Sequence, residues 1–140
     1  MATVGKVLIA GGSVAGMSCA IQMRKAGIAV DLIEIDPSWR IYGAGITITG
    51  PTLRALRTLG VLHEVLAEGA SWNGVKVHDK SGTLLESVTF PPLAEDLPAT
   101  GGVMRPVLHR ILSAKVLAAG VNVRLGVRVE ELRDRGAQVE

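Results

Sequence analysis

The chain has 140 residues, of which 48% are hydrophobic, so it is long enough and apolar enough to fold around a real core. Its 15 basic and 13 acidic residues leave a net charge of +2 and form no basic stripe of the kind that nucleic acid requires. Aromatic residues make up only 3%, so platforms for stacked bases are not expected either. We therefore expect no nucleic-acid partner.

Residues 7–34 predict a βαβ unit, in which a strand over 7–10, a glycine-rich turn and a helix lead to a second strand that ends at Glu34. Gly11 lets the chain turn sharply, and Gly16 lets the helix pack closely against the sheet. The N–H groups of the turn and the positive end of the helix dipole would face a diphosphate. Glu34 follows Gly16 by 18 positions, where a carboxylate can accept hydrogen bonds from ribose hydroxyls. The unit predicts a nucleotide site; the alternative is a plain βαβ crossover without a ligand.

The turn departs from the usual fingerprint G-x-G-x-x-G at its middle glycine, because Ser13 occupies that position. A Cβ there crowds the phosphate, although the serine hydroxyl can donate a hydrogen bond to it. The order of strand, turn, helix, strand and acid still favours nucleotide binding.

The first predicted helix contains the single cysteine and lies in an uncharged run, and both features indicate where the protein is located. Cys19, the single cysteine, cannot form a disulfide within the chain, and we interpret it as a small buried side chain in a reducing, cytoplasmic setting. No charged residue occurs between positions 7 and 23. A membrane span needs about 20 apolar residues, however, and this run is interrupted by glycine and serine. We therefore expect a soluble protein with no membrane segment and no targeting signal.

The middle of the chain predicts a short strand over 46–49 and then two helices. Pro51 suits the first turn of the first helix, which ends at Gly60, and the second covers 62–67. We expect the two helices to form a helical hairpin against the sheet. Alternating or strand-forming residues over 75–78 and 83–90, joined by a turn signal, predict a β-hairpin.

The last third of the chain predicts a loop, a helix and a pair of strands. These segments are a loop over 91–102, a helix over 106–119 capped by Gly120, strands over 121–125 and 127–133, and a turn at 134–136. The chain stops partway into the strand that follows this turn, which would leave unpaired backbone groups. We therefore expect it to be truncated at its C-terminus.

Neither a catalytic constellation nor a metal site is visible in the pattern. His63, His78 and His109 are far apart in sequence, so we expect each to be a surface residue without a catalytic role. No cluster of His, Cys or carboxylate residues has the spacing of metal ligands. We expect Trp39 and Trp72 to be packing or surface residues.

Four segments resemble the N-terminal part of the class A flavoprotein monooxygenases, the p-hydroxybenzoate hydroxylase-like group of FAD-dependent aromatic hydroxylases. They are the βαβ unit, residues 40–61 with their GAGI…P…LRAL…LG sequence, residues 104–112 with the R-x-x-L-x-x-x-L helix start, and residues 121–132. The glycine-rich turn alone is shared by many NAD and FAD proteins. The second and third segments make the resemblance specific.

The resemblance implies an α/β fold class, with a Rossmann-like βαβ FAD-binding domain on a parallel sheet and a β-hairpin that contributes to a substrate domain. It divides the chain into an FAD-binding core with the helical hairpin (1–70), the hairpin and loop of the substrate side (71–100), and an incomplete return to the FAD-binding domain (101–140).

The resemblance also implies which residues bind the cofactor. The turn would hold the FAD diphosphate, with Arg40 nearby, and Glu34 would hold the adenosine ribose. The flavin ring would lie close to Gly45 and Ile46. Arg105 would reach ribose or ribityl hydroxyls, and adenine would lie against the backbone of Val129. The expected cofactor-binding residues are Gly11, Ser13, Val14, Ala15, Gly16, Glu34, Ile35, Arg40, Gly45, Ile46, Arg105 and Val129.

The roles of the two arginines, Arg40 and Arg105, also have physical support that does not depend on the resemblance. Arg40 precedes a Gly-Ala-Gly turn, where its planar donor fork can neutralise a phosphate that the glycines allow to approach. Arg105 stands at a predicted helix start, where a cation opposes the dipole unless an anion or polyol lies nearby.

In the family, NAD(P)H reduces FAD and O2 then supplies a hydroxyl group to an aromatic or related small molecule. Two later family motifs, an Asp-Gly and a Gly-Asp pair, do not occur in this chain, so we expect activity only with a C-terminal part, supplied in some cases by a complementing chain. One alternative is the NAD(P)-binding domain of a dehydrogenase or reductase, which leaves residues 40–46 and 105–112 unexplained. The other is a non-catalytic nucleotide-binding or interaction module.

Overall fold

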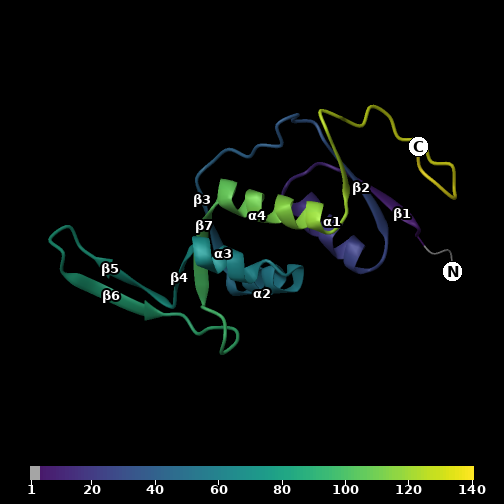
Figure 1. Ribbon diagram of the computed structural model, residues 1–140. Helices are drawn as coiled ribbons and strands as arrows, with labels where there is room; N and C mark the ends of the chain where they lie inside the picture. The colour runs from purple at the N-terminus through teal and green to yellow at the C-terminus, as the bar shows by residue number, and fades with distance from the viewer. Residues whose placement is uncertain (1–3) are drawn as a thin grey trace. The chain divides into compact units, whose positions relative to one another are not determined.

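The computed structural model describes residues 4–140, which form the helices and strands labelled in Figure 1. The chain divides into two compact units: unit 1 is Met1–Arg40 with Leu112–Glu140, and unit 2 is Ile41–Ile111. The boundary falls within helix α4 (Arg105–Ala118). The division into FAD-binding and substrate parts at residues 70 and 100 stays a prediction.

Unit 1 contains a parallel sheet in which β2 (Ala29–Glu34) lies between β1 (Lys6–Ala10) and β8 (Asn122–Leu125). Helix α1 (Val14–Lys25) joins β1 to β2 and contacts both strands. The core of this unit includes the fully or almost fully buried side chains Met17, Ala20, Ile21, Val30, Leu32 and Ile33. The predicted βαβ unit and its parallel sheet are confirmed.

Unit 2 contains an antiparallel sheet in the order β3 (Gly45–Thr49), β7 (Thr100–Met104), β4 (Ala70–Trp72). Helices α2 (Gly50–Leu59) and α3 (Leu62–Glu68) contact each other and strands of this sheet. The leucines spaced along α2 are buried, and Gly60 ends the helix at φ 77°, as its position predicted. The helical hairpin against the sheet is therefore confirmed.

The predicted β-hairpin is also present, as β5 (Gly74–His78) paired with β6 (Leu84–Thr89). It forms the two-stranded ribbon of unit 2 in Figure 1. Asp79 organises the turn, because its Oδ1 accepts hydrogen bonds from the hydroxyl of Ser81 and from the N–H groups of Ser81 and Thr83. These hydrogen bonds, the Ser81 hydroxyl above all, lower the pKa of Asp79.

Two segments differ from the sequence prediction. The end of the predicted loop over 91–102 is part of strand β7, which begins at Thr100 and contains two glycines. A Cβ on Gly101 would lie 2.8 Å from the carbonyl oxygen of Ala70, so glycine here permits close strand pairing instead of marking a loop. Strand β4 was not predicted, because it has only three residues and no alternating pattern.

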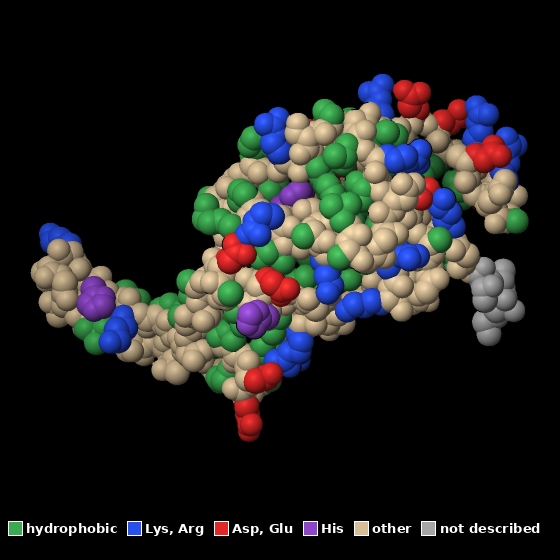
Figure 2. Space-filling model, viewed as in Figure 1, with side chains coloured by type: hydrophobic (Ala, Val, Ile, Leu, Met, Phe, Trp, Pro, Cys, Tyr) green, Lys and Arg blue, Asp and Glu red, His purple; other side chains and the backbone are tan. Residues whose placement is uncertain are grey.

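Residues 127–133 do not form the predicted strand. The N–H of Val127 still bonds to the carbonyl oxygen of Glu34 at 3.0 Å, but the pairing beside β2 ends there. Arginines and acidic residues are interspersed through the C-terminal stretch, where Figure 2 shows mixed blue and red side chains, and three ion pairs form within it. The predicted turn at 134–136 is present and is closed by a bridge between Asp134 and Val139.

Two single-residue predictions were wrong. Cys19 is exposed, because the buried face of α1 is formed by Met17, Ala20 and Ile21. His109 is only 8% exposed and follows buried Leu108 in α4, whereas His63 and His78 are exposed as expected. Among residues 4–140, no helix combines the length and apolar character needed to cross a membrane.

Candidate functional site

The glycine-rich turn connects the end of β1 to the start of α1. Gly11 adopts φ 105°, a conformation that favours glycine, while its N–H bonds to the carbonyl oxygen of Ile33 at 2.8 Å. Ser13 is extended and caps the helix, whose first backbone hydrogen bond runs from Met17 N to Ser13 O at 2.9 Å. The N–H groups of residues 13–16 precede this first bond, so they are the donors that a helix start offers to an anion.

Gly16 sets the distance between α1 and the sheet. A Cβ on Gly16 would overlap the carbonyl oxygen of Gly11 and would contact the side chain of Ile9 at 3.4 Å. The obstacle is backbone and cannot rotate away. The conformational roles that the sequence assigned to Gly11 and Gly16 are therefore confirmed.

Glu34 lies at the end of β2 and is tied to the turn. Its Oε2 accepts a hydrogen bond from Gly12 N at 2.7 Å, and its Oε1 accepts one from Asp36 N at 2.9 Å. No sequence pattern predicts this contact between Glu34 and the turn. A carboxylate has about four lone-pair sites, so each oxygen retains acceptor capacity for a further donor.

The loop over residues 36–40 also contacts the turn. Trp39 donates from its indole Nε1 to the carbonyl oxygen of Gly12 at 2.8 Å. Asp36 shapes the loop by accepting hydrogen bonds from Ser38 N at 2.8 Å and Arg40 N at 3.0 Å, which lower the pKa of its carboxyl group. The Asp-Pro-Ser sequence is a turn signal, but it gives no indication that the tryptophan returns to the glycine-rich turn.

The other predicted residues of unit 1 lie at its surface. Ile35 is 63% exposed and Val129 is 38% exposed, and the side chains of Ser13 and Arg40 are exposed as well. The hydroxyl of Ser13 makes no capping hydrogen bond with the helix. The structure thus brings residues 11–16 together with Glu34, and it leaves these four accessible to a ligand.

Unit 2 brings together Gly45, Ile46 and Arg105. Gly45 is paired with Met104 across β3 and β7, and Arg105 N donates to the carbonyl oxygen of Ala44 at 3.2 Å. The Arg105 side chain lies against Gly43, where a Cβ would be 3.4 Å from its Cδ. A cavity of about 490 Å³ adjoins this sheet and is lined by Gly45, Ile46, Thr47, Glu68, Gly69, Ala70, Gly102, Val103 and Met104.

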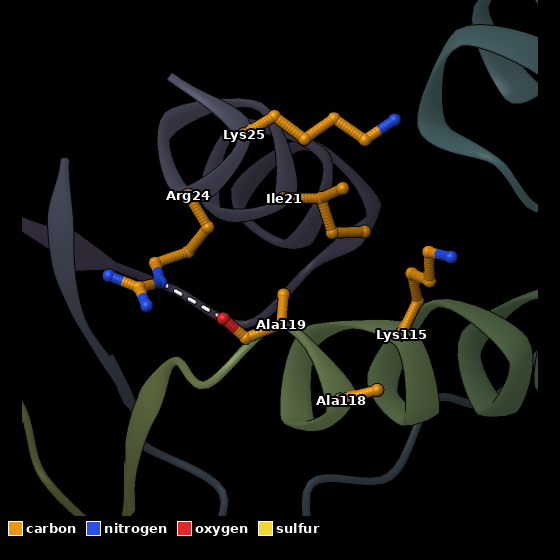
Figure 3. Close-up of a pocket in the computed structure, with 6 residues that line it drawn as sticks. All are labelled: Ile21, Arg24, Lys25, Lys115, Ala118 and Ala119. Carbon is orange, nitrogen blue, oxygen red and sulfur yellow. Dashed lines mark hydrogen bonds between the residues drawn. The ribbon is translucent and has the colours of Figure 1, made fainter. Parts of the chain in front are cut away.

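A second cavity, of about 300 Å³, lies in unit 1 between the C-terminal parts of α1 and α4 (Figure 3). Arg24 closes one side of it, because its Nε donates to the carbonyl oxygen of Ala119 at 2.9 Å. Its Nη1 also donates to Ile28 O at 3.3 Å. This arginine satisfies carbonyl groups that follow the two helices, and none of the predicted cofactor residues lines the cavity.

Comparison with known proteins agrees with this geometry. The family described as "FAD binding domain" matches residues 5–140. YetM of Bacillus subtilis, assigned to the FAD-dependent monooxygenases, is 37% identical over 123 residues, covering 88% of this chain and 33% of that protein. The aurachin C monooxygenase/isomerase of Stigmatella aurantiaca is 32% identical over 133 residues, covering 91% of this chain and 33% of that protein.

The crystal structure of 2-methyl-3-hydroxypyridine-5-carboxylic acid oxygenase has a similar fold, with a TM-score of 0.75 and 28% sequence identity over 89% of this chain and 32% of that one. The chain thus spans about a third of the length of the relatives that it matches. The family match covers nearly the whole sequence, and the resemblance found in the sequence is confirmed. The chain belongs to the FAD-binding domain family, and these relatives are monooxygenases or oxygenases.

Proposed function

We propose that this chain is the cofactor-binding, N-terminal portion of an FAD-dependent monooxygenase that hydroxylates an aromatic or related small molecule with NAD(P)H and O2. The observation that carries the proposal is the geometry of unit 1, where a glycine-rich turn, a helix N-terminus and a strand-terminal glutamate converge. The family match and the named oxygenases among the relatives support it.

The residues of unit 1 fit the ADP half of FAD. The N–H groups of residues 13–16 would hold the diphosphate, because a helix start presents unpaired donors and positive potential. Glu34 would accept hydrogen bonds from the adenosine ribose through the acceptor capacity that Gly12 and Asp36 leave on its oxygens. Exposed Arg40 would neutralise diphosphate charge, and Ile35 and the backbone of Val129 would lie beside the nucleoside.

The residues of unit 2 fit the flavin half. Gly45 and Ile46 line the 490 Å³ cavity, and the position of a Cβ on Gly45 has no atom closer than the carbonyl oxygen of Val103 at 3.6 Å, so a planar ring could approach the backbone there. Arg105, at the start of α4, would donate to ribityl hydroxyls. When bound, FAD would supply the redox chemistry with NAD(P)H and O2, while these residues would bind and orient it.

The relatives suggest what the complete protein acts on. Some of them are named for reactions of pyridine or quinolone compounds, so we propose a small aromatic substrate. Because the chain spans about a third of those relatives, we propose that a further C-terminal part completes the enzyme. The single cysteine, which cannot form a disulfide within the chain, supports a reducing, cytoplasmic location.

Equilibrium titration of the 140-residue protein with FAD, FMN and NAD⁺ tests the proposal. We expect saturable binding of FAD, weaker binding of FMN because it lacks the AMP part and carries only one phosphate, and no comparable binding of NAD⁺. Binding of NAD⁺ without FAD would instead support the dehydrogenase or reductase alternative. Binding of none of the three would support the non-catalytic alternative.

A further inference from the structure

We propose that Trp39 is a positioning residue of the cofactor site: it fixes the glycine-rich turn by holding Gly12, and it is the reason that position 12 must be glycine. The inference rests on the proposed function, since it assigns Trp39 a part in binding the diphosphate. Trp39 itself would not touch the phosphates.

Gly12 is held on both sides. Its N–H donates to Oε2 of Glu34 at 2.7 Å, and its carbonyl oxygen accepts from Nε1 of Trp39 at 2.8 Å. Gly12 is buried and the two bonds are partly buried, so water competes with them less than it would at the surface. The two peptide groups that flank Gly12, just before the helix cap at Ser13, are therefore fixed in orientation.

The indole ring occupies the space that a side chain at position 12 would need. A Cβ on Gly12 would overlap the indole nitrogen of Trp39 and would lie 3.0 Å from its Cε2 and 3.1 Å from its Cδ1. Gly12 is not among the glycines with positive φ, so its backbone conformation does not require glycine. In the fingerprint G-x-G-x-x-G this is a position open to other residues. The steric demand at this position thus comes from the tryptophan.

The tryptophan is itself held in an unfavourable conformation. Trp39 has φ 44°, the only positive φ of a non-glycine residue between positions 4 and 140, and such a conformation is costly for a bulky side chain. Hydrogen bonds around Asp36 maintain it: Trp39 N donates to Asp36 O at 3.1 Å, and Asp36 N donates to Glu34. Glu34, Asp36, Trp39 and Gly12 therefore form a closed ring of hydrogen bonds around the turn.

This ring of hydrogen bonds determines which N–H groups of the turn can bind the diphosphate. Because the N–H of Gly12 is committed to Glu34, the donors that remain for phosphate are those of residues 13–16. The first of these donors, the N–H of Ser13, lies in the same peptide plane as the carbonyl oxygen of Gly12, which Trp39 holds. Release of that oxygen would lower affinity for the diphosphate by leaving the donors to be ordered on binding.

A double-mutant cycle between positions 12 and 39 tests the inference, with calorimetric titration of ADP as the probe and circular dichroism to verify folding. Trp39→Phe keeps a ring but loses the donor, and we expect about fivefold weaker binding of ADP. Trp39→Ala should bind about tenfold more weakly or worse. Gly12→Ala should weaken binding strongly in the presence of Trp39 but add almost nothing in the Trp39→Ala background, where the space is free. Trp72→Phe, at the other tryptophan, should leave ADP binding unchanged.

A role confined to folding would move the thermal midpoint of these variants while the folded protein bound ADP normally. Affinity of Trp39→Ala within twofold of the wild type, or additive losses from the two substitutions, would overturn the inference and leave the proposed function intact. Wild-type protein that binds neither ADP nor FAD would contradict the proposed function, and the inference with it. Should Trp39→Ala fail to fold, Trp39→Phe decides the same question through its ADP affinity alone.

Discussion

Gly16 of helix α1 lies against the carbonyl oxygen of Gly11, so closely that no side chain fits between them. We predict that Gly16→Ala destabilises the protein by about 2 kcal/mol or more, because overpacking against backbone outweighs the gain of about 1 kcal/mol in helix propensity. Denaturant titration measures the difference. Gly5→Ala is the matched control, since a Cβ there meets nothing within 4 Å, and it should change stability by less than about 0.5 kcal/mol.

Asp31 connects the three strands of the parallel sheet and predicts a pH dependence. It pairs with Lys6 Nζ at 2.8 Å and accepts from Asn122 Nδ2 at 3.1 Å, and these hydrogen bonds lower its pKa. A depressed carboxyl pKa contributes stability above the unfolded value of about 3.9, and this contribution is lost as the pH falls through the folded value. We therefore predict that the thermal midpoint falls less between pH 5 and pH 3 in Asp31→Asn than in the wild type.

The control for that measurement is Glu95→Gln, which removes an exposed acid of unit 2 that forms no ion pair among the described residues. Its midpoint should follow the wild-type pH profile. An Asp31→Asn profile parallel to that of the wild type would show that Asp31 titrates alike in the folded and unfolded states.

The parts that the sequence predicted well are those whose signals are local. The strand, turn and helix of residues 7–34 could be predicted from the hydrophobic period and the positions of the glycines. The end of helix α2 could be predicted from Gly60. Strand β7 was missed because Gly101 and Gly102 carry no strand preference of their own. They belong to a strand because β3 and β4 pair with it on both sides, which is information from distant parts of the chain.

The candidate site shows the same division between local and distant signals. Glu34 and the glycines could be placed by spacing, whereas the contact from Trp39 to Gly12 spans 27 positions and has no sequence pattern. The predicted strand over 127–133 failed because β8 ends at Leu125 and the pairing beside β2 continues only as far as the bond from Val127 N to Glu34 O. Local strand preference does not supply a partner strand.

Thr100 provides a test of the antiparallel sheet in unit 2. Its hydroxyl is buried and donates to the carbonyl oxygen of Ile48 at 3.0 Å. Thr100→Val keeps the shape but removes the donor, so we predict a loss of about 1 kcal/mol in the free energy of unfolding. Thr49→Val, at the exposed residue opposite Thr100, should change stability by less than about 0.5 kcal/mol. Equal losses in the two variants would contradict the assigned role of the buried hydroxyl.

Arg105 distinguishes the two halves of FAD. If its guanidinium donates to ribityl hydroxyls, Arg105→Ala should weaken FAD binding by about tenfold or more while ADP, which has no ribityl chain, binds as before. Arg54→Ala removes an exposed arginine from helix α2 and serves as the control, with both affinities unchanged. Equal loss of FAD and ADP would place Arg105 at the adenosine ribose instead.

Ser13 offers the most direct test of the claim that the start of α1 binds the diphosphate. It is exposed, caps the helix and makes no side-chain capping bond, so aspartate should fit there without loss of stability, while its charge would oppose phosphate. The measurement is titration of FAD into Ser13→Asp, with the neutral isostere Ser13→Asn beside it. We predict that Ser13→Asn binds FAD within a fewfold of the wild type and that folded Ser13→Asp binds at least about tenfold more weakly. Wild-type affinity in folded Ser13→Asp would contradict the diphosphate site.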